Sequence, residues 1–158
     1  MNAVIERVRS VWVPLHGMTV LVPNASVAEV LDHQTVERID NGPQWLLGAV
    51  RWRDLRIPAV SMELLLGGDY RCAAGSGKIM VFNSARAQTT VPFLAVPISG
   101  IPSLLTADAE GLGESLTGES ELARTIACCI RSGEKQAYIP DLSAIQGIVE
   151  DAWQDTAE

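Results

Sequence analysis

The sequence predicts a mainly β protein in which two small β-barrel lobes form one domain. Apolar residues recur with a period of two along most of the chain, which is typical of strands that bury one face. Polar or glycine-containing segments interrupt this alternation and divide it into four hairpins, or roughly eight strands. A chain of 158 residues can bury roughly 70% of the surface that its unfolded form exposes. Many short, regularly spaced strands in a domain of this size favour barrels or sandwiches.

Each predicted hairpin consists of two alternating runs and the polar turn between them. In the first, valine and leucine alternate with other residues up to a break at His16 and Gly17. The third has a longer polar loop, and the fourth turns at residues 132–135. The four hairpins span residues 9–23, 48–60, 78–98 and 124–140.

The second hairpin is unusually rich in charge for a predicted pair of strands. Val50 and Trp52 share one face of its first strand, and Arg51 lies on the other. Arg53 and Asp54 form the predicted two-residue turn. Because only one face of such a sheet needs to be buried, we expect the charged face and the turn to be offered to partners.

Prolines and short helices recur after the hairpins. The return strand of each hairpin runs into a proline, which removes a backbone donor and is expected to stop the strand. These prolines are Pro23, Pro58, Pro97 and Pro140. Short helices are predicted after three of them, capped by Asn24, by Ser61, and by Asp141 or Ser143. The repetition favours internal duplication, with the glycine-containing stretch 67–78 as the seam between the lobes.

The net charge of −7 is unevenly distributed. Residues 1–107 contain 9 basic and 8 acidic side chains, whereas residues 108–158 contain 3 basic and 11 acidic ones. Scattered, outnumbered basic residues offer no stripe for phosphates, so nucleic acid is not an expected partner. The acidic stretch 108–121 is predicted to be a solvated loop.

The sequence predicts a cytoplasmic protein without membrane insertion. No run approaches the about 18 apolar residues that cross a membrane, and the first residues lack the pattern of a secretory signal. We expect a single domain of two lobes at residues 1–150 and an acidic C-terminal tail at residues 151–158.

Few side chains could support catalysis. His16 and His33 are expected in solvent-exposed turns or loops, and no motif of a hydrolase, a metalloenzyme or a phosphate-binding loop is present. Three cysteines, Cys72, Cys128 and Cys129, form no metal-binding or disulfide pattern. We therefore predict a protein that is not an enzyme and needs no metal or cofactor.

An interaction module is the remaining interpretation, since tryptophan and arginine dominate binding at protein interfaces. Trp52 is nevertheless expected in the core, because it alternates with arginines on a strand. The chain has four tryptophans to consider for such an interface, Trp12, Trp45, Trp52 and Trp153, and Trp52 is the one that we expect to be buried.

The stretch LGAVRWRDLRIPAVSMELLLG resembles the signature of CheW-like adaptor proteins. The matching positions are Gly48, Arg53, Ile57, Pro58, Val60 and Gly67. GMTVLVPNASVAEVL resembles an earlier segment of the family, and VPFLAVPISGI and SGEKQAYIPDLSAI resemble later ones, so the resemblance covers about residues 8–148. Three positions depart from the family's pattern: Asp54 replaces a glycine, and Ser61 and Pro97 each replace an aspartate.

The resemblance implies two five-stranded β-barrels in one domain, without catalytic activity. Members of the family connect chemoreceptor tips to the CheA-type histidine kinase in bacterial signalling arrays, which makes both proteins the expected partners. By matching position, Arg53 falls on the family's turn arginine, next to Asp54, and Val27 and Glu29 fall in a receptor-facing segment. The pattern is more similar to the accessory adaptors of type IV pilus chemosensory systems than to the main flagellar adaptor, and the resemblance implies an array with either a flagellar or a type IV pilus output. The alternative is a small-molecule-binding β-barrel with a ligand between the lobes and no catalytic activity.

Overall fold

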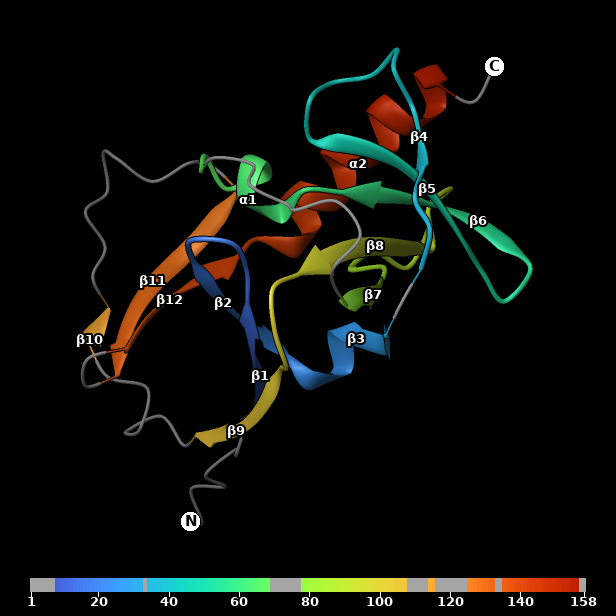
Figure 1. Ribbon diagram of the computed structural model, residues 1–158. Coiled ribbons are helices and arrows are strands. Elements are labelled where there is room, and N and C mark those ends of the chain that lie inside the picture. Colours follow the sequence, from blue (N-terminus) through green and yellow to red (C-terminus); the bar gives the residue numbers. More distant parts are fainter. Residues whose placement is uncertain are drawn as a thin grey trace.

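The computed structural model in Figure 1 consists of two β-sheets and a long C-terminal helix. It describes residues 8–32, 34–68, 78–107, 114–115, 125–132 and 135–156. No helix within these ranges is long and apolar enough to cross a membrane. His33, Cys72 and most of the acidic stretch 108–121 lie outside the described residues.

Six strands form each sheet. The first sheet has the order β10-β11-β12-β2-β1-β9. Its strands are β1 (Val8–Pro14), β2 (Thr19–Pro23), β9 (Ser103–Ala107), β10 (Glu114–Ser115), β11 (Ile126–Ser132) and β12 (Lys135–Pro140). The second sheet has the order β3-β7-β8-β6-β5-β4. Its strands are β3 (Val27–Leu31), β4 (Glu37–Arg38), β5 (Leu46–Trp52), β6 (Leu55–Val60), β7 (Lys78–Asn83) and β8 (Phe93–Ile98).

All four predicted hairpins are present, and both sheets join them in the same way. The antiparallel pairs are β1–β2, β5–β6, β7–β8 and β11–β12. In the first sheet the return strands β2 and β12 pair in parallel at Val20 and Tyr138. In the second sheet the return strands β6 and β8 pair in parallel at Ala59 and Ala95. The two sheets therefore share one plan, as the repetition in the sequence predicted.

The resemblance implied two five-stranded barrels, and the structure has two six-stranded sheets in their place. Each has a strand of only two residues at one edge, β10 or β4, and five longer strands beside it. Among the described residues, no pairing joins the outermost strands of either sheet. The lobes are mainly β and curved, and their sheets are open.

The lobes are not divided where the glycines suggested. Residues 67–78 lead from β6 and α1 (Met62–Leu65) to β7, and β6 and β7 belong to the same sheet. The chain instead crosses between sheets at residues 23–27 and again at residues 98–103. The first sheet thus combines the first and fourth hairpins, and the second combines the two middle ones.

Two of the three predicted helices are present. Ser61 Oγ accepts a hydrogen bond from the Leu64 N–H at 3.3 Å and caps α1. Asp141 Oδ1 accepts one from the Ala144 N–H at 3.0 Å and caps α2 (Leu142–Thr156). Helix α2 continues to Thr156, so residues 151–156 of the expected tail are helical.

The helix predicted after Asn24 is wrong. Asn24 lies inside a single 3₁₀ turn, η1 (Asn24–Ser26), and the following residues form β3, which pairs with β7. The β-branched Val27 and Val30 fit a pleated strand better than a helix. Sheet pairing therefore overrides the capping signal at this position.

The prolines do not all stop their strands. Pro23 and Pro140 are the last residues of β2 and β12, as expected, but Pro58 and Pro97 lie inside β6 and β8. The pairing between β6 and β8 is registered at Ala59 and Ala95 only. A proline inside a strand has no N–H to donate to the neighbouring strand. Because the parallel pairing of β6 and β8 is so short, it needs few donors, and both prolines are tolerated.

The largest apolar cluster joins the two sheets and α2. It contains Val13 and Val20 from the first sheet, Met80 from the second, and Ile145 and Val149 from the helix, each with no exposed surface. A second cluster, around Trp52, lies within the second sheet. Figure 1 shows α2 alongside the strands of that sheet. The helix that follows the first sheet thus packs on the second and links the two lobes.

Candidate functional site

The β5–β6 turn has a backbone conformation that its residues adopt reluctantly. Arg53 has φ +48° and Asp54 has φ +63°, which makes this a two-residue turn with both central residues left-handed. Aspartate tolerates this region, whereas arginine favours it much less. The turn extends beyond the neighbouring strands of its sheet (Figure 1), and both side chains are exposed.

Arg53 and Glu29 are in direct contact. The Arg53 Nη2 donates to Glu29 Oε1 at 3.2 Å, and the Trp52 indole Nε1 donates to Glu29 Oε2 at 3.2 Å. The Arg53 guanidinium also lies over the Trp52 ring, with its Cζ 4.4 Å from the ring centroid. The three side chains therefore hold one another in place, and we call them the Glu29 cluster.

Curvature of the second sheet brings these residues together. Glu29 lies on the edge strand β3, whereas Trp52 ends β5, four strand positions away in the sheet. In a flat sheet, strands four positions apart are about 19 Å from each other. A side-chain contact of 3.2 Å requires the sheet to roll strongly toward a barrel, which is the shape that the sequence predicted.

Trp52 connects the Glu29 cluster to the core. Its side chain is 5% exposed and meets Phe93 edge to face, with ring centroids 4.7 Å apart. By contrast, 65% of the Arg53 side chain and 39% of the Glu29 side chain are exposed. An ion pair this accessible adds little stability, about 0–1 kcal/mol. The cluster presents a fixed charged surface on a rigid base.

The other two predicted site residues lie beside this cluster without joining it. Asp54 is next to Arg53 in the turn and exposed. Val27 is half-buried, pairs with Phe82 and packs against the main core. A register shift between Val27 and Glu29 changes the direction of the following side chains, as β-bulges do.

Sequence reasoning did not identify the contacts of Arg56. Its Nε lies 3.7 Å from Glu37 Oε2 on β4, and its Cζ lies 5.1 Å from the centroid of the Trp153 ring on α2. Trp153 itself is half-buried, as are Trp12 and Trp45. Only Trp52 among the four tryptophans is buried, which confirms its expected place in the core.

His16 is half-buried, so its expected exposure is wrong. Its Nδ1 lies 2.9 Å from Glu63 Oε2, and the same oxygen accepts the His16 backbone N–H at 3.1 Å. The Glu63 side chain is only 2% exposed. A buried carboxylate needs such partners to offset its lost hydration. The pair fastens the β1–β2 turn to α1, and the glutamate inside the apolar run SMELLL was the available signal.

Two cysteines, Cys128 and Cys129, lie within the described residues. Cys129 is buried and Cys128 is half-buried, as expected for at least one small apolar residue in this strand. The described residues contain no group of three or more histidine, cysteine, aspartate or glutamate side chains that could hold a metal ion.

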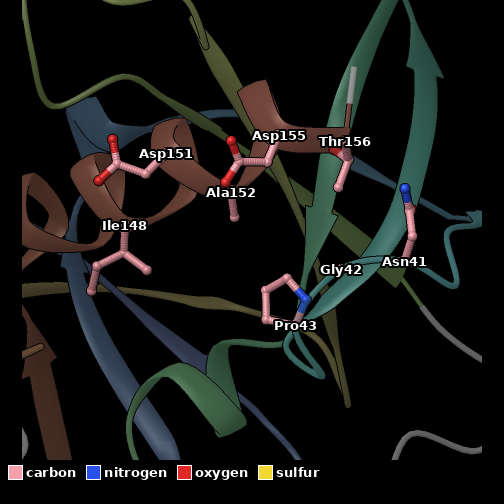
Figure 2. Close-up of a pocket in the computed structure, with 8 residues that line it drawn as sticks. All are labelled: Asn41, Gly42, Pro43, Ile148, Asp151, Ala152, Asp155 and Thr156. Atoms are coloured by element: carbon pink, nitrogen blue, oxygen red, sulfur yellow. The ribbon is translucent and has the colours of Figure 1, made fainter. Parts of the chain in front are cut away.

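An open pocket of about 480 Å³ lies between the β4–β5 loop and the second half of α2. Figure 2 shows Ile148 and Ala152 of the helix across from Pro43, with the carboxylates of Asp151 and Asp155 turned away from the proline. Its lining contains no strand of the first sheet. It is therefore not the cavity between the lobes that a small-molecule-binding barrel was expected to have.

Comparison with known proteins identifies a family and a fold. The family model described as the CheW-like domain matches residues 9–149. The crystal structure of the scaffolding protein TtCheW from Thermoanaerobacter tengcongensis superposes with a TM-score of 0.68 and 12% sequence identity, over 85% of this chain and 88% of that one. This likeness concerns the fold. No curated protein matches the chain significantly.

Proposed function

The chain belongs to the CheW-like domain family, and we propose that it is a non-catalytic scaffold connecting chemoreceptors to a CheA-type histidine kinase. The observation that supports this most directly is the Glu29 cluster at the exposed β5–β6 turn. Two residues that the family resemblance assigned to partner binding, Glu29 and Arg53, meet there at 3.2 Å.

The geometry of the Glu29 cluster suits binding better than catalysis. Contact with Trp52 and Glu29 restrains the Arg53 side chain before any partner arrives. Less side-chain entropy is therefore lost when a partner binds. Its guanidinium still has exposed donors for a carboxylate or a carbonyl group. A mostly exposed ion pair contributes little to folding, so its role is better explained by an interface.

The location of the protein follows from this proposal. A scaffold between receptors and kinase works in the cytoplasm, at membrane-associated receptor arrays. We extend the proposal to the accessory adaptors of type IV pilus chemosensory systems, and hence to twitching motility, on the resemblance of LVPNASVAEV and WRDLRIPAVS.

Binding to purified partners tests the proposal. Wild-type protein and the variants Arg53→Ala and Arg9→Ala would be titrated separately with a CheA-type kinase and with a receptor signalling tip from the same genome. We expect Arg53→Ala to weaken at least one affinity by about tenfold, as for a residue central to an interface. Arg9→Ala is the matched control, because Arg9 is an exposed arginine on the first sheet. Circular dichroism would establish that each variant is folded.

Two outcomes would reject the proposal or its site. If wild type binds neither the kinase nor the receptor tip, the scaffold function is wrong. If a folded Arg53→Ala variant binds both with wild-type affinity, the function stands and the Glu29 cluster is not its site. A metabolite that raises the melting temperature of the wild-type protein would favour the small-molecule-binding alternative.

A further inference from the structure

The β5–β6 hairpin concentrates positive charge in a protein that is otherwise acidic. Three of the 12 basic residues of the chain, Arg51, Arg53 and Arg56, fall within six consecutive positions, while the net charge is −7. All three side chains are exposed. Glu29 lies 3.2 Å from Arg53, and Glu37 lies 3.7 Å from Arg56. Arg51 is therefore the one whose charge no ion pair among the described residues offsets.

Two of these arginines oppose each other across the strands. Arg51 on β5 and Arg56 on β6 are direct partners in the antiparallel register. Directly opposed residues have Cβ atoms about 5 Å apart, and like charges in such pairs destabilise a sheet. Arg56 has contacts within the chain, with Glu37 and Trp153, so Arg51 is the arginine of this pair that folding does not explain.

The contacts within the chain do not balance this pair. Arg56 lies 3.7 Å from an exposed Glu37 carboxylate and over the Trp153 ring. Arg51 forms no ion pair with any side chain that the structure describes; the hydrogen bond nearby, from Gln34, goes to its backbone carbonyl. One strongly basic group on this face is thus free to bind an acid.

We propose that Arg51 and Arg56 form a docking site for an acidic segment of a protein partner. The inference rests on the proposed scaffold function for the existence of that partner and adds its chemistry. Two arginines at directly opposed positions suit an acidic segment, because each guanidinium can bind a carboxylate through two parallel hydrogen bonds. A carboxylate between them would also remove their mutual repulsion, so binding and relief of the strain between like charges favour the same complex.

This docking site is distinct from the Glu29 cluster. The Arg53 guanidinium packs over Trp52 and reaches β3, on the side of the second apolar cluster. Arg56 faces the opposite direction and packs on Trp153 of α2. Both faces of the hairpin end therefore carry an arginine contact, and the two can be tested separately.

Carboxylates fit this surface better than nucleic acid or lipid phosphates. Single-stranded nucleic acid is held by exposed aromatic rings beside cations, whereas Trp52 is buried and Trp153 already packs against Arg56. A basic membrane site needs a larger cluster, typically about four to eight cations. A pair of arginines on a narrow hairpin matches a short acidic segment of protein.

Peptide binding tests the inference without requiring the natural partner. Fluorescein-labelled hexaglutamate would be titrated with wild type, Arg51→Gln, Arg56→Gln and Arg9→Gln, using fluorescence anisotropy at ~50 mM and ~300 mM salt. We expect binding by wild type and Arg9→Gln that weakens with salt. Each hairpin variant should bind about two- to fivefold more weakly, the range for single exposed ion pairs. Arg51→Gln should not lower the melting temperature, because it removes a like-charge contact.

The outcomes separate this inference from the proposed function. No binding of hexaglutamate by wild type, or equal affinity in all variants, would overturn it. Tighter, Arg51-dependent binding of hexathymidylate or of phosphatidylglycerol vesicles would overturn it in favour of phosphate. Arg51-dependent peptide binding without any kinase or receptor binding would support the acidic docking site and reject the scaffold function.

Discussion

Gly48 is the position where the second sheet leaves no room for a side chain. A Cβ atom there would lie 1.9 Å from the Glu37 carbonyl oxygen of β4, and the residue has φ +156°. Both the clash and the backbone conformation exclude other residues. The close approach holds the two-residue strand β4 against β5.

Gly48→Ala should therefore be strongly destabilising. We expect a loss of at least about 2 kcal/mol, because backbone atoms of β4 must move. Urea denaturation would measure it. Gly17→Ala is the matched control: Gly17 has φ +83° but no atom within 4 Å of the place that a methyl group would occupy, so only about 1 kcal/mol of backbone strain is expected. Equal losses in the two variants would contradict the steric explanation.

Glu150 connects helix α2 to the loop between β7 and β8. Its carboxylate accepts hydrogen bonds from the Thr89 hydroxyl and from Gln146 Nε2 at 3.3 Å, and Arg86 Nη1 lies 3.5 Å away. The Thr89 hydrogen bond is the main cause that lowers the pKa of Glu150 below its ordinary 4.5, against the opposing effect of burial. The ionised form is thus favoured in the folded protein.

This lowered pKa predicts how stability depends on pH. As the pH falls, Glu150 takes up its proton in the unfolded chain before it does so in the folded protein. The stability that ionised Glu150 contributes is therefore fully present above about pH 4.5 and is lost as the pH falls through the folded pKa. Thr89→Val removes the largest cause and should flatten the acid side of the stability curve. Urea denaturation between about pH 3 and 7, relative to wild type, would measure this. An unchanged slope would show that Thr89 does not favour the ionised form.

At the scale of the element, the β5–β6 turn combines an unfavourable backbone with an exposed charged surface. Arg53 and Asp54 both adopt positive φ. The Asp54 side chain is exposed. Two-residue turns of this kind prefer glycine at the second position. The turn is therefore less stable with aspartate at position 54 than it would be with glycine.

Asp54→Gly should stabilise the hairpin. Relief of the left-handed strain is expected to exceed the entropy that glycine adds to the unfolded chain, with a gain of about 0.5–1 kcal/mol. Differential scanning calorimetry would show a melting temperature raised by roughly 1–4 °C. Asp40→Gly is a control at a surface aspartate outside this turn and should not raise it. A lower melting temperature for Asp54→Gly would mean that the aspartate has a stabilising contact.

The sequence predicted hairpins well and single strands poorly. A hairpin such as β5–β6 has local signals: period-two alternation, a two-residue turn and arginines on the exposed face. Strand β3 has only five residues and pairs with β7, about fifty residues later. Its capping signal at Asn24 was local and its pairing was not, so the wrong element was predicted.

The same distinction holds for the candidate site. Arg53 and Glu29 could be selected by their match to a family, but their contact depends on how far the second sheet curls. Trp52 was correctly expected in the core, and its second role as donor to Glu29 needed the three-dimensional structure. The packing of Arg56 on Trp153 joins residues about a hundred positions apart, which no local pattern encodes.

At the scale of the whole molecule, the chain order of the hairpins differs from their arrangement. The first sheet takes strands from both ends of the chain, and the second takes the middle. Helix α2 then returns from the first sheet to pack on the second. The seam predicted at residues 67–78 failed because glycine content reports local flexibility and not which sheet a strand joins.

The shared core predicts that the two lobes unfold together. Met80 of the second sheet is fully buried in the cluster that also holds Val13 and Val20 of the first. Met80→Ala should cost about 2–5 kcal/mol through lost contacts and a cavity. Because this cluster belongs to both sheets, hydrogen exchange should speed up equally in the slowest amides of β1–β2 and of β7–β8. Faster exchange confined to β7–β8 would show that each lobe folds on its own. The apolar cluster around Met80 would then be a contact between two separately folded lobes and not a common core.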